Sequence, residues 1–262
     1  PPHLAPDSPP GRGVTAPTRQ RRGLRRSRDL FASFLVEQSD PDRFYGHLAA
    51  DSLATLSEHV EVRDRIVVDV GAGPAQFAAA FRAAGAHYVP LDHDPHVASV
   101  ADGGIVGSAL ALPLATGSID IVFSSNLLEH VPDVEGVADE MVRVLRPGGV
   151  LYLSYTNWLS PWGGHEASPW HWVSGDYAAR RYERKHGKPP KNRLGETIHR
   201  TSIAQGLTWA TRTPDIEILA ARPRYLPDTF RHLLRLPGVR EILTWNLLLV
   251  VRKRPAPVAP TR

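Results

Sequence analysis

Short apolar runs alternate with longer stretches of helical periodicity through the middle of the chain. The runs are rich in β-branched residues and are bounded by glycine and polar residues, as in Ile66–Val70 and Ile119–Phe123. Runs of this length and composition are typical of buried parallel strands. The stretches between them, such as 76–84 and 134–145, have the composition or the apolar spacing of helices. This alternation predicts an α/β fold in which helices cover a parallel sheet.

Seven strands are predicted from these runs. They are Ile66–Val70, His87–Leu91, Gly104–Gly107, Ile119–Phe123, Val150–Ser154, Ile216–Ala221 and Asn246–Val251. Asp40 followed by Pro41 predicts the start of a helix that runs to about His59, because proline is tolerated in a first turn. A further helical stretch is expected around 227–236, and Arg146–Gly149 is typical of a helix end.

An insertion of roughly sixty residues separates the fifth and sixth predicted strands, which is too long for a simple crossover. We place it at 157–213. Its aromatic and imidazole side chains are Trp158, Trp162, Trp170, Trp172, His165, His171, His186 and His199. Because ligands bind at the carboxyl ends of parallel strands and the insertion leaves from one, we expect it to select the substrate.

The net charge of +4 is carried by the two ends of the chain. Residues 1–28 hold seven arginines and one aspartate, and residues 252–262 hold four basic residues, so the rest is acidic. We expect 1–28 to form a disordered basic tail and 29–262 to form one domain, with the cofactor-binding core at 66–156. Nucleic-acid binders usually carry their basic surface on the folded domain, which makes a nucleic-acid partner unlikely, whereas basic tails suit peripheral contact with a membrane surface.

The 262 residues include no cysteine. This composition excludes disulfides, thiolate zinc sites and a cysteine nucleophile, and with it the enzymes that methylate C5 of cytosine through a cysteine adduct. The longest apolar run, Leu247–Val251, is far too short to cross a bilayer. The arginine-rich start is not followed by an apolar segment, so a cytoplasmic location is expected.

A nucleotide-type cofactor site is predicted after the first strand. The segment Gly71–Ala75 permits a sharp turn and a close approach of the backbone to a ligand. The N–H groups of the following helix would point at that ligand. Asp92, about twenty residues further on at the end of the next strand, lies where an acid reaches the hydroxyls of a ribose. NAD(P), FAD and S-adenosylmethionine all suit such a loop.

Three features favour S-adenosylmethionine. Asp69 lies two residues before the first glycine, where it can face a cationic or amino-acid group. Gln76 stands where a dinucleotide fingerprint continues to its third glycine. Downstream, Leu112–Leu114 and Leu145–Gly149 complete an ordered set of motifs.

These motifs, from Ile66 to Thr156, resemble those of the class I S-adenosylmethionine-dependent methyltransferases, in their small-molecule branch. The resemblance implies a Rossmann-like sheet of strand order 3-2-1-4-5-7-6, with the last strand antiparallel. The segments Arg43–Gly46, Ser154–Trp158 and Gly163–Glu166 also resemble a group of actinobacterial methyltransferases of largely unassigned substrate.

The resemblance also implies which residues bind S-adenosylmethionine. The matching positions are Asp69, Gly71, Gly73, Asp92, Ser108, Ala109, Ser125 and Asn126. The first three would cradle the methionine part and Asp92 the ribose. Ser108 and Ala109 would lie beside the adenine, and Ser125 and Asn126 under the cofactor. The chain departs from the family pattern at Ala75, where a third glycine is usual, and at Ser108, where an acid is common.

Methyl transfer requires alignment of the acceptor and, for a hydroxyl, removal of a proton. His165 follows two glycines on a loop of the insertion and is the preferred candidate for the base, with Glu166 to orient or activate a histidine. His130, next to Glu129, is an alternative, although a structural or cofactor-side role suits it as well. No metal site is expected, because the spacing from His165 to His171 offers no evident third ligand.

The predicted function is S-adenosylmethionine-dependent O-methylation of a small or lipid-linked metabolite. One alternative is an RNA methyltransferase, against which the acidic body and the lack of an Asn-Pro-Pro-Tyr-type motif argue. A second alternative is a non-catalytic cofactor-binding protein, for which Ala75 and Ser108 are the hints.

Overall fold

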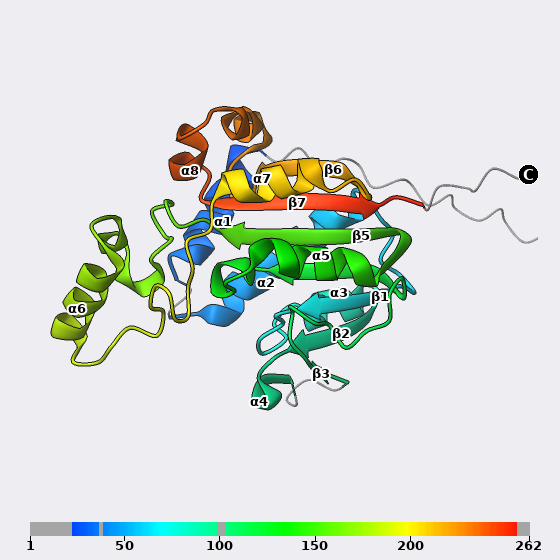
Figure 1. Cartoon of the computed structure of the whole chain (residues 1–262), viewed down its shortest axis with the longest axis horizontal. Helices are drawn as coiled ribbons and strands as arrows, with labels where there is room; N and C mark the ends of the chain where they lie inside the picture. The colour runs from blue at the N-terminus through cyan, green and yellow to red at the C-terminus, as the bar shows by residue number, and fades with distance from the viewer. Residues whose placement is uncertain (1–22, 37–38, 99–102, 256–262) are drawn as a thin grey trace, which may run out of the picture.

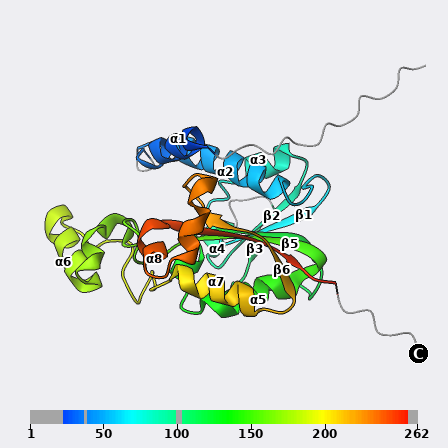
Figure 2. The same cartoon turned by 90° about the horizontal axis from the view of Figure 1, so that it is seen from above.

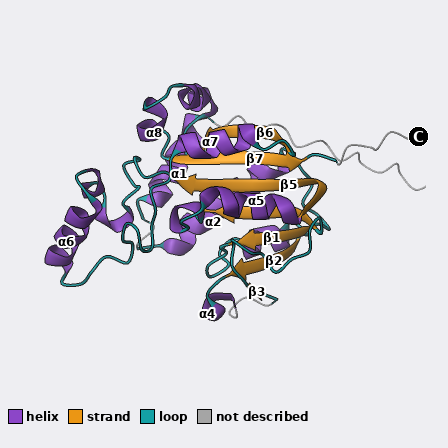
Figure 3. Ribbon diagram, in the orientation of Figure 1, coloured by secondary structure: helices purple, strands orange, loops and turns teal. Residues whose placement is uncertain are grey.

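The computed structural model describes residues 23–36, 39–98 and 103–255. It contains one seven-stranded sheet of order β3-β2-β1-β4-β5-β7-β6 (Figures 1 and 3). The strands are β1 Ile66–Val70, β2 His87–Asp92, β3 Ile105–Val106, β4 Ile119–Ser125, β5 Leu145–Thr156, β6 Ile216–Pro223 and β7 Asn246–Lys253. β7 is antiparallel to both of its neighbours, and the other pairs are parallel. The predicted topology is confirmed.

Helices cover both faces of this sheet (Figure 2). One face carries α1 Leu24–Phe34, α2 Pro41–Ser57 and α3 Ala78–Ala83, and the other carries α5 Val134–Val144 and α7 Ile203–Arg212. Alternate side chains of each central strand point to opposite faces, so Val67 packs against the first group and Val68 against the second. Two apolar cores therefore share the sheet as their common wall. The other α-helices of the described residues are α4 Pro95–Ala98, α6 Gly175–His186 and α8 Val239–Leu243.

Local sequence accounts for where the main helices begin and end. The Asp40 carboxylate accepts a hydrogen bond from the backbone N–H of Arg43, and Pro41 occupies the first turn of α2, as predicted. Asp133 caps α5 in the same way through Gly136. The helix ends at Val144, one residue before the predicted end at Leu145, and the next strand begins at Leu145 rather than at Val150.

The predicted boundary of the N-terminal tail is wrong. Helix α1 begins at Leu24, so residues 24–28 are helical, and residues 1–22 lie outside the described part. The Arg26 side chain is 17% exposed and pairs with the Asp51 carboxylate on α2. This arginine is a docking contact for α1, whereas Arg25 and Arg28 remain solvated.

The basic residues near the other end are also partly structural. Lys253 lies at the end of β7, where its ammonium group donates to the carbonyl oxygens of Arg143 and Leu145 at 3.0 and 2.8 Å. Arg252 pairs with Glu217 of β6. The remainder of the predicted basic C-terminus, 256–262, lies outside the described residues.

The insertion forms a separate lobe at the carboxyl ends of the parallel strands (Figure 1). It contains the 3-10 turns η2 His165–Ala167 and η3 Trp170–Trp172 together with α6. The insertion ends before residue 213, where it was predicted to end, because helix α7 packs against the sheet beside α5. Trp209 of α7 is 4% exposed and donates a hydrogen bond to Asp139 of α5. None of the helices in the described residues is both long and apolar enough to span a bilayer.

Candidate functional site

The turn after β1 needs glycine for two separate reasons. Gly71 and Gly73 have φ angles of +77° and +52°, in the left-handed region that favours glycine. A Cβ atom on Gly71 would lie 2.8 Å from Cδ1 of Leu127, which is inside van der Waals contact. Around a Cβ on Gly73, by contrast, no described atom lies within 4 Å. The turn is therefore tight against Leu127 and open above Gly73.

Asp92 joins this turn to the end of β2. Its Oδ2 atom accepts a hydrogen bond from the Gly73 N–H at 3.0 Å, and its Oδ1 atom accepts from Asp94 at the same distance. A carboxylate has about four lone-pair sites, so both oxygens can accept further hydrogen bonds. Asp92 can thus fix the glycine turn and hold two hydroxyl groups at once.

A cavity of about 240 Å³ opens between these elements. Its walls are made by Gly71, Leu91, Asp92, His93, Gly107, Ser108, Ala109, Leu110, Leu127, His130 and Val131. Apolar side chains dominate these walls, and one carboxylate stands among them. That combination fits an adenosine group, whose flat base is apolar on its faces and whose ribose presents two hydroxyl donors.

The predicted cofactor residues divide into two groups. Gly71, Asp92, Ser108 and Ala109 line the cavity together, and Gly73 reaches it through its bond to Asp92. Asp69 does not line the cavity, because its carboxyl group is 1% exposed and accepts a hydrogen bond from the Tyr88 hydroxyl. Burial raises the pKa of Asp69 to about 7. Its proximity to the methionine part of a cofactor remains a prediction.

Ser125 and Asn126 lie beside the cavity, at the end of β4. The Asn126 side chain accepts a hydrogen bond from Asn246 at 2.8 Å, and its backbone has a φ of +58°. The Ser125 hydroxyl accepts from the guanidinium of Arg224 at 2.9 Å. These contacts join both half-buried residues to a layer of polar side chains that includes Arg224 and Asn246.

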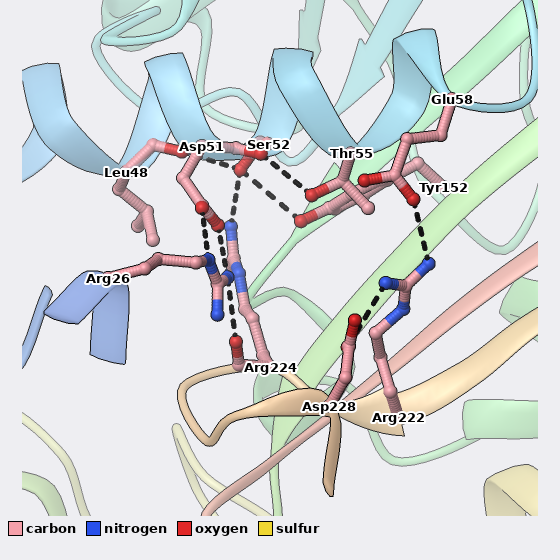
Figure 4. A network of polar contacts seen from close by, with 10 residues as sticks. All are labelled: Arg26, Leu48, Asp51, Ser52, Thr55, Glu58, Tyr152, Arg222, Arg224 and Asp228. Atoms are coloured by element: carbon pink, nitrogen blue, oxygen red, sulfur yellow. Dashed lines mark hydrogen bonds and ion pairs between the residues drawn. The ribbon is translucent and has the colours of Figure 1, made fainter. Parts of the chain in front are cut away.

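Arg224 organises that layer and was not singled out from the sequence. It follows β6 and is fully buried. Its guanidinium donates to Ser52 of α2, Ser125 of β4 and Ser154 of β5, at 2.8 to 2.9 Å. Figure 4 shows this arginine reaching toward α2, close to the Arg26–Asp51 pair. An arginine among Arg222-Pro223-Arg224 offers no periodic signal, so this role depends on tertiary structure alone.

His130 stands on the 3-10 turn η1 Leu128–His130, directly after β4, and lines the cavity. Its Nδ1 atom lies 2.7 Å from the carbonyl oxygen of Thr197 in the insertion. A carbonyl can only accept, so Nδ1 must carry the proton and Nε2 is left with a free lone pair.

His165 comes from the insertion and faces His130, with 5.2 Å between the ring centroids. Its Nε2 atom is buried and has no hydrogen-bond partner among the described residues. Burial lowers the pKa of His165 to about 4, with the His130 ring adding to the effect. The imidazole is therefore neutral at pH 7 and presents an unused lone pair.

Glu129 completes the group. It is 3% exposed, and its Oε1 atom accepts a hydrogen bond from the backbone N–H of Thr156 at 3.2 Å. Its Oε2 atom is buried without a partner in the described part of the chain. Burial raises the pKa of this carboxyl. One ligand-type atom from each of Glu129, His130 and His165 lies within 4.8 Å of the other two.

Two other predicted candidates point elsewhere. The Glu166 carboxylate accepts from the backbone and side-chain nitrogens of Asn192, both at 2.8 Å, so these hydrogen bonds hold Asn192. Its negative charge acts to raise the pKa of His165 against the larger effect of burial, and its role in activating a histidine stays a prediction. The Nε2 atom of His171 contacts the carbonyl oxygens of Trp158 and Ser160, and the ring is 2% exposed. Glu166 and His171 hold the insertion together.

The glycine pair before His165 has a packing reason. A Cβ atom on Gly163 would lie 2.1 Å from the Trp158 carbonyl oxygen, and one on Gly164 would lie 2.6 Å from the His171 ring. Both glycines therefore allow the loop to fold onto its own aromatic residues. This close fold directs His165 toward His130.

The chain is similar to known proteins over most of its length. A family model described as "Methyltransferase domain" matches residues 68–153. An uncharacterised methyltransferase of Mycobacteroides abscessus is 45% identical over 252 residues, covering 90% of this chain and 96% of its own length. One of Mycolicibacterium gilvum is 46% identical over 246 residues, covering 88% and 96%.

Solved structures show the same fold. An S-adenosylmethionine-dependent methyltransferase of Mesorhizobium loti superposes with a TM-score of 0.53 at 20% identity, covering 78% of this chain and 98% of its own. A second, from Methanosarcina mazei, gives a TM-score of 0.52 at 18% identity, covering 77% and 98%.

Proposed function

Because the chain belongs to the S-adenosylmethionine-dependent methyltransferases, we propose that it methylates a hydroxyl oxygen of a small or lipid-linked metabolite. The observation that carries this proposal is the group of Glu129, His130 and His165, of which His130 lines the cofactor cavity. An O–H acceptor must lose a proton during transfer, and one buried carboxyl with two half-buried imidazoles can take one up.

Different residues of the cavity would bind different parts of S-adenosylmethionine. Asp92 would accept hydrogen bonds from the two ribose hydroxyls, while Leu127 and Ala109 would contact the adenine. The open side of Gly73 leaves room for the rest of the molecule. The bound cofactor supplies a methyl group already activated by its sulfonium, so the chain itself has to position the acceptor and manage its proton.

The histidine pair is suited to that second task. In a neutral ring each Nε2 atom can carry a lone pair, and His165 is neutral at pH 7 because burial lowers its pKa to about 4. The pair is brought together by the insertion, since Thr197 binds His130 and the loop carrying His165 closes over it. We therefore assign removal of the hydroxyl proton to this cluster.

The surface of the insertion supports an acceptor with an apolar part. Leu159, Trp170, Trp172 and Val173 are between 40% and 67% exposed on it. The acidic balance of the chain between its basic ends, by contrast, disfavours RNA as the acceptor.

Transfer of a labelled methyl group tests the proposal. The purified protein is incubated with ¹³C-methyl S-adenosylmethionine and fractions of a mycobacterial extract: polar metabolites, lipids and RNA. The expected result is label in the metabolite or lipid fraction, with a methoxyl carbon signal. Label in RNA, or on nitrogen or carbon, would refute O-methylation of a small acceptor. His186→Ala, an exposed change on α6, serves as the control that keeps the activity.

A further inference from the structure

We propose that Glu129, His130 and His165 bind one divalent transition-metal ion at the wall of the cofactor cavity. The sequence separates these residues by up to 36 positions. The only spacing that it offered runs from His165 to His171, and the His171 side chain binds the Trp158 carbonyl instead. In the structure, one ligand-type atom of each of the three lies within 4.8 Å of the other two.

The three side chains present free lone pairs for a reason that can be stated for each. His130 is held with Nδ1 on the Thr197 carbonyl, which directs the Nε2 lone pair away from that bond. A histidine that donates one ring N–H to a carbonyl is the usual outer-shell arrangement of a metal ligand. His165 has a buried Nε2 atom with no partner, and Glu129 has a buried Oε2 atom with no partner, in the described part of the chain.

Leaving such atoms unpaired is costly unless something else binds them. A buried polar atom without a hydrogen bond costs about 1–3 kcal/mol, and more when it is charged. Glu129 is only 3% exposed, and its Oε1 atom already accepts a hydrogen bond from the Thr156 N–H, so Oε2 is the unpaired atom. A cation between the three side chains would satisfy all of these atoms at once.

The backbone supports the same conclusion. His165 has a φ of +49°, a conformation that side chains other than glycine rarely adopt. It is kept there by the hydrogen bond from its N–H to the Trp162 carbonyl at 2.9 Å and by the tight packing of Gly164 on His171. Strain of this kind is retained where it positions a functional group.

The donor set selects the kind of ion. Imidazole nitrogens suit Zn²⁺, Co²⁺, Ni²⁺ and Fe²⁺, whereas Ca²⁺ and Mg²⁺ prefer oxygen ligands alone. Ligand atoms about 2.0–2.2 Å from one zinc ion lie roughly 3–4 Å from each other, so small side-chain rotations complete the site. Three protein ligands would leave a further position open toward the cavity that His130 lines.

In one respect this inference rests on the proposed function. An ion at this position would lower the pKa of a hydroxyl placed beside it, so proton removal at the cluster would not require a free histidine base. Metal binding itself does not depend on the acceptor or on methyl transfer, and it can be measured alone.

The test is metal uptake by protein freed of any affinity tag and treated with a chelator. Zn²⁺ is titrated in competition with a chromophoric chelator, and Co²⁺ is added separately to record its visible absorption. His165→Asn is the principal variant, because asparagine tolerates a positive φ. Glu129→Gln keeps an oxygen for Thr156, and His186→Ala removes an exposed histidine of the same insertion.

The wild type and His186→Ala should each bind one equivalent of Zn²⁺, with a Co²⁺ spectrum that saturates at one equivalent. His165→Asn and Glu129→Gln should each lose about 100-fold or more in affinity, beyond the loss typical of an outer-shell partner. Equal binding by all four proteins, or no saturable binding by the wild type, would overturn the proposal. Calorimetry with S-adenosylhomocysteine on the same samples separates the two hypotheses: cofactor binding without zinc binding rejects the metal site alone, and zinc binding without cofactor binding rejects the proposed function alone.

Discussion

At the scale of single residues, Asp92 is the side chain on which cofactor affinity depends most. Replacing it with alanine would remove the two charge-assisted hydrogen bonds that we propose to the ribose, together with the anchor of the Gly73 N–H. At about 1.5 kcal/mol for each ribose bond, S-adenosylhomocysteine should bind roughly 100-fold more weakly to Asp92→Ala. Isothermal calorimetry measures this directly.

Asp92→Asn is the matched control for that prediction. It keeps an oxygen for Gly73 but replaces the charge, so its affinity should fall between those of the wild type and the alanine variant. Unchanged affinity in Asp92→Ala would show that this carboxylate does not bind the ribose.

Asp69 affects the free energy of unfolding, and its effect depends on pH. Burial raises its pKa from 3.8 to about 7 in the folded protein, so the folded state binds this proton more tightly than the unfolded state does. Stability is therefore lost as the pH rises from about 4 to about 7, and the loss is complete above that range. Asp69→Asn does not titrate and still accepts the hydrogen bond from Tyr88.

The free energy of unfolding of Asp69→Asn relative to the wild type should thus be about 2 kcal/mol larger near pH 8.5 than near pH 5.5. Urea unfolding at the two pH values measures it. An advantage that is equal at both values, or larger at the lower one, would contradict the assignment of the raised pKa.

Single residues were predictable where their role is local in the chain. Gly71 and Gly73 form a turn with their immediate neighbours, and Asp92 is the last residue of its own strand. The pairing of His165 with His130 depends on how a long insertion folds back, and no periodicity encodes that. Arg224 was missed for the same reason.

At the scale of elements, Arg224 ties a helix to two strands behind the cofactor turn. Arg224→Ala would leave the hydroxyls of Ser52, Ser125 and Ser154 without this donor and would open a buried cavity. The expected loss in free energy of unfolding is about 3 kcal/mol or more. Chemical denaturation followed by tryptophan fluorescence gives the value.

Arg224→Lys separates charge from geometry. A lysine keeps the positive charge but cannot reach three hydroxyls with a rigid fork, so it should recover less than half of the loss. Full recovery by lysine would show that charge alone matters here, and an unaffected alanine variant would show that the network is dispensable.

The elements themselves were largely predictable, because most strands are short apolar runs between turns and α2 and α5 begin at capping aspartates. The exceptions lie at the boundaries. Strand β5 begins at Leu145, which was predicted as the last residue of the preceding helix, because Leu145 pairs with Ile119 of β4. Helix α7 was counted with the insertion, since its packing against α5 through Trp209 is not visible along the chain.

At the scale of the whole molecule, the N-terminal helix connects parts that are far apart in sequence. Arg26 binds Asp51 and the carbonyl of Arg224, and Phe34 packs on Trp162 of the insertion at 5.0 Å between ring centroids. A chain that begins at residue 37 should therefore unfold at a lower temperature than one that begins at residue 23. Phe34→Ala in the longer chain should reproduce part of the difference.

Thermal unfolding of the three proteins measures this contribution. Equal midpoints for the two truncated chains would contradict a docking role for α1. The predicted disordered boundary at 28 was wrong for a related reason: the arginines were counted as solvated charges, whereas the partner of Arg26 lies on the next helix.

The proposed function depends on where the cofactor binds, and a crystal structure with S-adenosylhomocysteine tests that position most directly. The nucleoside is predicted to fill the cavity between Gly71, Asp92 and Leu127, with its ribose hydroxyls about 2.6–3.2 Å from the Asp92 oxygens. A nucleoside bound elsewhere, or a cavity closed by its own side chains in the presence of saturating ligand, would contradict the account.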